Sequence, residues 1–397
     1  MKLLSVVGAR PNFMKIAPFV AAINVHNRLH PDNPVQNILV HSGQHYDPTL
    51  SSRFFEELGI PNPDHHLNVG SGSHAYQVGT TMIEFERVLL SEKPDWVIVV
   101  GDVNAACACA LTAKKHQVRV AHIESGLRSN DWAMPEEINR VVTDRISDLL
   151  FTTCRFANAN LVQEGIAGAR IALVGNIMID TLEAHRERAG ARDPNEILAA
   201  NRSPEIAALA REPLTREGFG VLTLHRPSNV DESSTLVGYL DLMLELAEKL
   251  PIIFPIHPRT KARFKEFGLW SRLTSSSQIM VLEPLGYLDL LTLTMSARLF
   301  MTDSGGIQEE CCVVGTPCLT LRANTERPAT LVENGGTNYL VGSEPGRIRD
   351  TFGRVLALPR GDALRPPLWD GKTASRILAH LVDVQSRLGT SRVEHPS

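Results

Sequence analysis

The chain has 397 residues, a length for which two domains are expected because one hydrophobic core rarely grows so large. Its composition is 43% hydrophobic and 21% charged with a net charge of −4, which is typical of a globular protein and offers no basic surface for nucleic acid. No apolar run is long enough to span a membrane and no signal-peptide pattern opens the chain, so we expect a cytoplasmic protein that binds neither membranes nor nucleic acid.

Short apolar runs alternate with helical patterns along the first half of the chain. The runs lie at residues 2–7, 37–41, 95–102, 118–124, 148–153 and 170–175. Uninterrupted apolar sequence of this kind indicates strands buried on both faces, as in a parallel sheet covered by helices. Between them, residues 104–116 are rich in small side chains, which allow a helix to pack closely on such a sheet.

A connector and a second alternation follow. Residues 181–215, rich in Ala, Arg and Glu, predict exposed helix and connector. The apolar runs resume at residues 219–225, 251–257, 278–283, 297–303, 316–322 and 338–342. Two successive βα arrays predict an α/β protein with two doubly wound, Rossmann-like domains, whose ligands bind at the carboxyl ends of the strands. We place the domains at residues 1–176 and 177–372, with a last helix and tail at 373–397, and expect the site in a cleft between the domains.

The cysteines and the familiar ligand motifs narrow the chemistry. The six cysteines lie in apolar or alanine-rich strings without zinc-ligand spacing, so we interpret them as small buried hydrophobic residues in a reducing compartment. The sequence contains neither GxGxxG nor GxxxxGK followed by Ser or Thr, so it supports neither a dinucleotide fingerprint nor a Walker loop.

Residues 302–310, TDSGGIQEE, place two glycines between an apolar strand and a predicted helix. The N–H groups at such a helix start favour an anion and glycine lets it approach, although a tight turn also needs glycine for steric reasons alone. Cationic or ionisable side chains occur at or just beyond other strand ends: Arg10, Lys15, His225, Arg226, His257, Arg259 and Arg327. Any one of them could form a surface salt bridge, but as a group they favour a phosphate or diphosphate ligand.

Three acidic residues also follow predicted elements: Asp102, Glu124 and Glu136. Carboxylates repel an anion, so they make sense beside a neutral part of the ligand or a positive charge that develops during reaction. Glu136 has an equally good alternative as an acid in the first turn of a helix that begins with Pro135. Among the strand-end histidines, His225 is the best candidate for a proton carrier beside phosphate.

These motifs resemble, in kind and in order, those of the non-hydrolysing UDP-N-acetylglucosamine 2-epimerases. The resemblance runs from about residue 1 to about residue 385 and rests on GARPNFMK, SGQHYD, GDVN, HIESGLR, MPEEINR, GNIMIDTL, LHRPSN, PIHPRT, TDSGGIQEE and NTERP. It implies the GT-B fold, with the last helix crossing back to the first domain. It also implies interconversion of UDP-N-acetylglucosamine and UDP-N-acetylmannosamine without a nicotinamide cofactor or an essential metal. The family is usually dimeric, and its products feed bacterial surface polysaccharides.

The resemblance also assigns roles to individual residues. The residues matched to the nucleotide are Ser304, Gly305 and Gly306 for the diphosphate, Glu310 for the ribose, and Arg10, His225 and Arg327 for further contacts. Two positions near the uracil are Leu285 and Leu290, the second of which stands where an aromatic residue is common. The residues matched to the chemistry are Lys15, Asp102, Glu124, Glu136 and His225.

A regulatory role is implied for a further group of residues. Gln44, His45 and Gln77 match a second, regulatory substrate position found in some members of the family. The alternative is that these side chains anchor the loops after the second and third strands, and the sequence does not favour either role.

The expected chemistry follows from the substrate. The proton on carbon 2 is not adjacent to a carbonyl, so its direct removal by a carboxylate of pKa about 4 is very unfavourable. Departure of UDP first gives an oxocarbenium-like sugar whose carbon 2 proton is acidic enough to lose, and UDP then adds back to the resulting glycal. We hypothesise Asp102 or Glu136 as the base, Glu124 as the electrostatic partner and His225 as the group that assists departure of the phosphate.

Several other functions remain open at this stage. The hydrolysing 2-epimerases release free N-acetylmannosamine, but their corresponding strand end reads more like HIHGGE than the HIESGLR of this chain. A GT-B glycosyltransferase would bind an acceptor where the three carboxylates stand, and a sugar-nucleotide sensor would need no catalytic set. An epimerase of an oxidised or diacetamido UDP-sugar would differ in only a few loop contacts.

Overall fold

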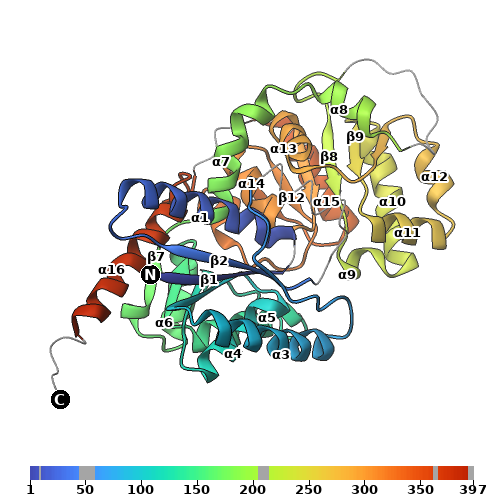
Figure 1. Cartoon of the computed structure of the whole chain (residues 1–397). Helices are drawn as coiled ribbons and strands as arrows, with labels where there is room; N and C mark the ends of the chain where they lie inside the picture. Colours follow the sequence, from blue (N-terminus) through green and yellow to red (C-terminus); the bar gives the residue numbers. More distant parts are fainter. Residues whose placement is uncertain (9, 44–58, 204–213, 361–364, 392–397) are drawn as a thin grey trace. The chain divides into compact units, whose positions relative to one another are not determined.

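The computed structural model describes residues 1–8, 10–43, 59–203, 214–360 and 365–391, and the chain divides into two compact units (Figure 1). The first unit comprises Met1–Glu183 and Pro367–Ser397, and the second comprises Ala184–Pro366. The chain passes from the first unit to the second within helix α7 (Ile177–Gly190). The boundary expected after residue 176 lies directly before this helix.

The first unit is built on a parallel sheet. Within its described residues, seven strands are hydrogen-bonded in the order β3-β2-β1-β4-β5-β6-β7. Their bounds are β1 (Lys2–Val7), β2 (Gln36–His41), β3 (His65–His66), β4 (Trp96–Val100), β5 (Arg119–Ser125), β6 (Leu149–Thr152) and β7 (Ile171–Leu173). The apolar runs of the first half correspond to β1, β2 and β4–β7, which confirms that prediction. The short β3 was not predicted, because two histidines carry no apolar pattern.

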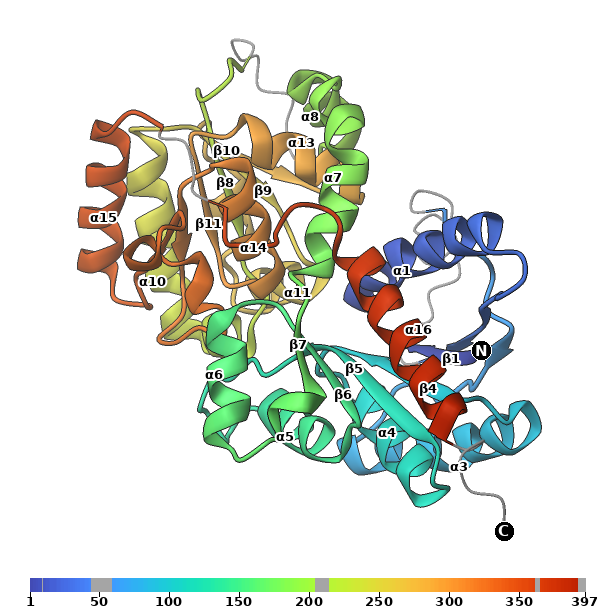
Figure 2. The same ribbon diagram turned by 90° about the vertical axis from the view of Figure 1, so that its left-hand side faces the viewer.

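Helices cover both faces of this sheet. Their bounds are α1 (Arg10–Leu29), α3 (His74–Glu92), α4 (Asn104–Lys115), α5 (Pro135–Ile146), α6 (Arg155–Gln163), the 3-10 turn η1 (Gly168–Arg170) and α16 (Thr373–Ser391). Helices α1 and α16 lie on one face, and α3, α4 and α5 on the other (Figure 2).

The last helix, α16, is part of the first unit. Its apolar side packs along α1, and Trp96 Nε1 in β4 donates a hydrogen bond of 2.9 Å to Gln385 Oε1. Asp180 of α7 accepts the backbone N–H groups of Thr373 and Ala374 at 3.0 and 2.7 Å, and so holds the start of α16. These contacts are far apart in sequence, so the unit needs both stretches of chain.

The second unit repeats the same architecture. Of its described residues, six strands form a parallel sheet in the order β10-β9-β8-β11-β12-β13. The strands are β8 (Gly220–Thr223), β9 (Ile252–Pro255), β10 (Ile279–Leu282), β11 (Leu299–Thr302), β12 (Cys318–Thr320) and β13 (Asn338–Leu340). They correspond to the six apolar runs of the second half, so that prediction is confirmed.

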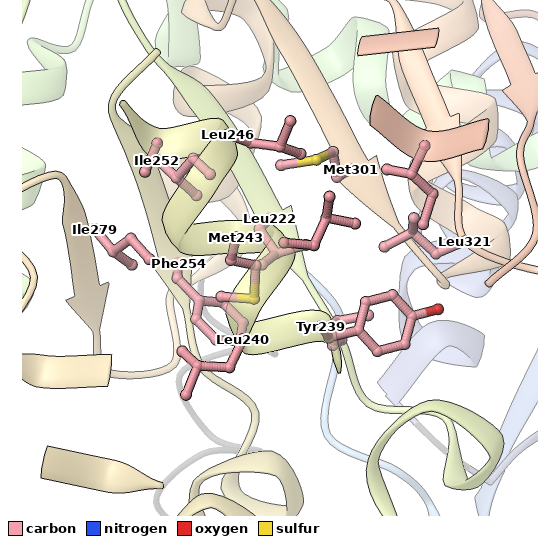
Figure 3. Packing of buried hydrophobic residues seen from close by; sticks show 14 of the residues in the cluster. Leu222, Tyr239, Leu240, Met243, Leu246, Ile252, Phe254, Ile279, Met301 and Leu321 are labelled. Carbon is pink, nitrogen blue, oxygen red and sulfur yellow. The ribbon is translucent and has the colours of Figure 1, made fainter. Parts of the chain in front are cut away.

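The helices of this unit connect successive strands, apart from α8 before β8 and α15 after β13. Their bounds are α8 (Pro194–Asn201), α9 (Pro227–Val230), α10 (Ser233–Ala247), α11 (Pro258–Glu266), α12 (Trp270–Thr274), α13 (Tyr287–Ser296), α14 (Gly305–Val314) and α15 (Pro345–Ala357), with 3-10 turns η2 (Pro328–Thr330) and η3 (Val332–Asn334). On α10, Leu240, Met243 and Leu246 share one side, because residues three apart lie on the same face of a helix. They pack with Leu222 and Phe254 of the sheet in one core cluster (Figure 3).

Residues 181–215 were expected to form exposed helix and connector. In the described part of this stretch the helices are confirmed by α7 and α8, and the exposure is confirmed only in part. Ile197 and Leu198 of α8 are buried in a core cluster with Phe219. Their large apolar side chains form only one adjacent pair, without a helical repeat, so the sequence pattern did not indicate a buried face.

All six cysteines fall in the described ranges and are free thiols. All except the half-buried Cys107 are buried, which agrees with their interpretation as small hydrophobic residues. None of the helices in the described part of the chain combines the length and the apolar content that crossing a bilayer requires.

Candidate functional site

The carboxyl ends of β4 and β5 carry Asp102 and Glu124. After β4 the chain turns at Gly101, with a φ of +68°, so that Asp102 directly follows a buried strand. In β5 the register with β6 shifts between Ile123 and Ser125, and Glu124 at this bulge has a φ of +70°. Such a backbone costs a non-glycine residue about 1–2 kcal/mol and is often found at functional sites.

Lys15 of α1 forms a buried ion pair with Glu124. The ammonium group contacts Glu124 Oε2, and the two residues are only 6% and 4% exposed. A Cβ at Gly101 would stand 3.2 Å from Lys15 Nζ, so the space beside the ammonium and the positive φ both favour glycine there. The structure therefore brings the predicted residues Lys15, Asp102 and Glu124 to one edge of the first sheet.

Asp102 is held by Arg140 of α5. Arg140 Nη2 contacts Asp102 Oδ2, and Arg140 Nη1 donates to Glu137 Oε2 at 2.8 Å. Glu137 also accepts the backbone N–H groups of Ser129 and Asn130, each at 2.9 Å. Burial raises the pKa of Glu137, but these backbone donors and the Arg140 guanidinium outweigh it, so the pKa lies below its ordinary value. The ionised Glu137 carboxylate thus orients Arg140, and Arg140 in turn holds the carboxylate of Asp102.

The neighbouring residues Glu136 and Glu137 have different environments. Glu136 is exposed in the first turn of α5, whereas Glu137 is buried in the Arg140 network. An exposed first-turn acid fits both the helix-terminus role and an accessible carboxylate, so both readings of Glu136 stay open. Sequence reasoning missed Glu137 and Arg140. The available signal was their i, i+3 spacing, which places an acid and a base on one helix face.

An amide chain links Asp102 to Gln77. Asn139 Nδ2 donates to the backbone oxygen of Asp102 at 2.9 Å and to Asn104 Oδ1 at 3.1 Å. Asn104 Nδ2 donates in turn to Gln77 Oε1 at 2.8 Å. The residues come from α5, α4 and α3, so three helix starts meet at the strand edge. Sequence reasoning singled out Gln77 but not the two asparagines.

In the second unit, Asp303 organises the end of β8. It accepts the backbone N–H groups of His225 and Arg226 at 3.0 and 2.9 Å and Asn229 Nδ2 at 3.0 Å. His225 Nδ1 lies 2.8 Å from Asp303 Oδ1. Burial raises the pKa of Asp303, but the His225 imidazole and the backbone donors outweigh it and leave the pKa below its ordinary value. The aspartate therefore orients His225, leaving Nε2 as the nitrogen that could exchange a proton with a ligand.

The predicted anion site lies at the start of α14. Ser304, Gly305 and Gly306 lie at its N-terminus, after β11. A Cβ on Gly305 would stand 2.5 Å from Arg327 Nη1, so glycine is needed for Arg327 to lie beside the helix start. Arg327 is buried and ion-paired, with Nε 2.9 Å from Glu309 Oε1 and Nη1 against Glu326. These pairs fix the guanidinium beside the N–H groups that favour an anion.

Glu310, predicted to contact a ribose, lies in α14 and is only 3% exposed. Burial raises the pKa of Glu310 to about 8, and Glu309 adds to this effect while a hydrogen bond with Tyr287 opposes it. Leu285 and Leu290 pack with Ile307 of α14 in one cluster. The residues predicted for the ribose and the base thus lie around a single helix.

Gln44 and His45 lie outside the described residues, and Arg10 begins α1 but its side chain is also outside them. Among the described residues, no group of three or more His, Cys, Asp and Glu side chains is arranged to hold a metal ion.

A family profile and the relatives of known name all match this chain to 2-epimerases of UDP-sugars. Residues 27–382 match the sequence profile of the family described as UDP-N-acetylglucosamine 2-epimerase. The chain is 41% identical over 381 residues to UDP-N-acetylglucosamine 2-epimerase of Methanocaldococcus jannaschii, covering 95% of this chain and 98% of that protein. It is 38% identical over 363 residues to UDP-2,3-diacetamido-2,3-dideoxy-D-glucuronate 2-epimerase of Pseudomonas aeruginosa, covering 90% of this chain and 94% of that protein.

A solved structure extends the likeness to the fold. The crystal structure of the Methanocaldococcus jannaschii enzyme in complex with UDP-GlcNAc and UDP superimposes with a TM-score of 0.84 at 40% identity, covering 96% of this chain and 99% of that one. The predicted fold class, GT-B with two doubly wound α/β domains, is thereby confirmed. Because the family profile spans most of the sequence and close relatives match it from end to end, the chain belongs to the UDP-N-acetylglucosamine 2-epimerase family.

Proposed function

We propose that this protein interconverts UDP-N-acetylglucosamine and UDP-N-acetylmannosamine by elimination and re-addition of UDP, without releasing a free sugar. The observation that carries the proposal is the strand edge of the first unit, where two ion pairs, Lys15 with Glu124 and Arg140 with Asp102, lie at the ends of the adjacent strands β5 and β4. Membership of the 2-epimerase family supports the same reaction. A binding protein would have no need for a strained, buried glutamate beside an accessible aspartate.

The second unit would bind the nucleotide. The start of α14 and Arg327 suit a diphosphate, because backbone N–H groups and a guanidinium both stabilise its charge. His225, oriented by Asp303, would stabilise the phosphate as the bond to the sugar breaks, and it could carry a proton. Glu310 carries its proton at neutral pH, given a pKa of about 8, and could both donate to and accept from a ribose hydroxyl.

The carboxylates of the first unit would act on the sugar. Departure of UDP leaves an oxocarbenium-like ring, whose positive charge Glu124 would stabilise electrostatically. Asp102 or Glu136 would then remove the proton on carbon 2 to give the glycal, and addition of UDP with protonation on the opposite face gives the epimer. Asp102 has the supporting network, since Arg140 and Asn139 hold its carboxylate and its backbone. Glu136 is exposed and thus accessible to a substrate, so both residues remain candidates for the base.

A related substrate is the second candidate. The Pseudomonas aeruginosa relative, at 38% identity over 90% of this chain, is named for a diacetamido glucuronate sugar. Both substrates share the UDP group and the carbon 2 chemistry, so the described residues support either one. The remaining expectations from the family resemblance are a homodimer, a cytoplasmic location and a regulatory role for Gln77, and they stay predictions.

Incubation of the pure protein with UDP-N-acetylglucosamine alone separates these functions. Formation of UDP-N-acetylmannosamine supports the proposal, whereas UDP plus free N-acetylmannosamine indicates a hydrolysing enzyme. No reaction with this substrate, but epimerisation of the diacetamido sugar, establishes the second candidate. No reaction until an acceptor is added indicates a glycosyltransferase. Turnover in heavy water must also label carbon 2 of both epimers, and unlabelled product would overturn the elimination route.

A further inference from the structure

A buried histidine lies beneath the strand edge that carries Asp102 and Glu124. His122 in β5 is fully buried, as is Asp144 in α5. Its Nδ1 lies 2.7 Å from Asp144 Oδ1, and its Nε2 lies 2.9 Å from the backbone oxygen of Gly101. Both ring nitrogens therefore have a single, well-placed partner. The proposed mechanism uses neither His122 nor Asp144.

These partners determine the protons on the ring. A backbone oxygen only accepts hydrogen bonds, so Nε2 must carry a proton that it donates to Gly101. Asp144 Oδ2 also accepts the Gly126 N–H at 3.0 Å and Arg128 Nη1 at 2.7 Å, as an ionised carboxylate does. Nδ1 therefore faces an acceptor as well and donates its own proton. An imidazole that donates from both nitrogens is an imidazolium.

The surrounding charges balance this assignment. His122 and Arg128 face Asp144, and Arg128 also pairs with Glu164 at 2.7 and 2.8 Å, which gives two cations and two anions. Burial raises the pKa of Asp144, but His122 and Arg128 outweigh it and leave the pKa below its ordinary value. Beyond the Gly101 turn, the buried pair of Lys15 and Glu124 is likewise balanced. A charged ring is thus compensated in a buried setting.

The same ring connects the elements that present both acids. The Gly101 carbonyl belongs to the peptide bond that leads into Asp102, and the Gly101 N–H donates to the backbone oxygen of Ile123 at 3.0 Å. Through Asp144 the ring is also linked to the Gly126 N–H, just after the bulge at Glu124. We infer that His122 is a positioning residue, held as an imidazolium between Asp144 and the Gly101 carbonyl, which fixes the strand ends that carry Asp102 and Glu124. The catalytic part of this inference rests on the proposed function, whereas the charge on the ring does not.

Nuclear magnetic resonance tests the charge directly. In protein labelled with ¹⁵N-histidine and kept in the buffer of the activity assay, both His122 nitrogens should resonate as protonated nitrogens, because each donates to an oxygen. The His122 signals are assigned as those absent from the His122→Gln variant. A wild-type spectrum with one unprotonated His122 nitrogen would overturn the inference. This result does not depend on which reaction the protein catalyses.

Two variants separate the two hydrogen bonds. In His122→Gln the side-chain amide can occupy the position of Nε2 and keep the hydrogen bond to the Gly101 carbonyl, but it loses the bond to Asp144. In His122→Asn the amide can occupy the position of Nδ1 and keep the bond to Asp144, but it loses the bond to Gly101. We expect His122→Asn to lower kcat by about 10²-fold, because displacing a reacting group by about 1 Å has an effect of that size. We expect His122→Gln to retain most of the activity.

Controls make the outcome specific. UDP affinity should be the same in both variants. The unfolding midpoint should fall further in His122→Gln, which loses the bond to a buried carboxylate, than in His122→Asn, which loses a bond to a neutral carbonyl. Losses of kcat that follow the losses of stability, with His122→Gln the less active variant, would show a purely structural histidine and overturn the positioning role. If the wild-type protein does not epimerise a UDP-sugar at all, the proposed function fails, while the resonance result still decides the charge of His122.

Discussion

Glu310 is a fully buried carboxyl group whose protonation should make stability depend on pH. The ordinary pKa of the group is 4.5 and burial raises it to about 8, so between these values the folded protein holds a proton that the unfolded chain releases. The stabilisation from the protonated form is therefore complete below about pH 4.5 and is lost as the pH rises through about 8.

The change Glu310→Gln removes this titration while keeping the shape of the side chain. From about pH 5 to about pH 8, the free energy of unfolding of the wild type should fall relative to the variant, by at most about 1.4 kcal/mol per pH unit. Urea unfolding of both proteins without nucleotide measures their free energies of unfolding at each pH. The difference between the two proteins removes the contribution of the titrating groups that they share. Parallel curves for the two proteins would show that Glu310 is ionised throughout.

Gly305 makes the position of Arg327 testable. In Gly305→Ala the new Cβ would lie 2.5 Å from Arg327 Nη1, so the guanidinium must move away from the start of α14. We expect UDP to bind about tenfold more weakly, a loss of about 1.4 kcal/mol, as measured by calorimetry. Gly353→Ala on α15 is the matched control, because its Cβ would meet nothing within 4 Å. Unchanged affinity in Gly305→Ala would show that Arg327 does not contact the nucleotide.

At the scale of elements, apolar runs located the described strands except β3, because most of these strands are buried on both faces of a parallel sheet. The polar ends of those strands then indicated Asp102, Glu124 and His225 as candidates, since an acid or a histidine directly after a buried strand is costly unless it is paired or used. The supporting residues were not predictable in this way. Asn104, Asn139 and Arg140 lie on helices, and their partners are set by how α3, α4 and α5 pack together rather than by any local pattern.

The amide chain between these helices predicts a coupling between Gln77 and Asp102. In Gln77→Glu the carboxylate still accepts from Asn104, and in Asn104→Asp the Gln77 amide can turn to donate, so each single change should have little effect. The double variant places two carboxylates face to face and should displace Asn139 and, through it, Asp102. We expect kcat to fall about fivefold beyond the product of the single effects, a coupling of about 1 kcal/mol. Multiplicative effects on kcat would show that the chain carries no coupling.

At the scale of the whole molecule, the first unit is completed by a helix that follows the entire second unit in sequence. Leu381 of α16 is fully buried, whereas Ala379 on the same helix is exposed. Leu381→Ala should therefore lower the free energy of unfolding by about 2–5 kcal/mol, and Ala379→Ser should change it little. Denaturant unfolding measures both changes. Equal, small effects would mean that α16 adds little to the stability of the first unit.

The place of α16 has a consequence for synthesis on the ribosome. Residues 184–366 form an uninterrupted stretch and can mature as soon as they have left the exit tunnel. The N-terminal sheet is translated earlier, but the side of α1 that contacts α16 stays exposed until the last turns of α16 have left the ribosome. In a nascent chain stalled shortly before Thr373, the second unit would therefore be folded, whereas the first unit would be incomplete and open to binding by chaperones and cleavage by proteases.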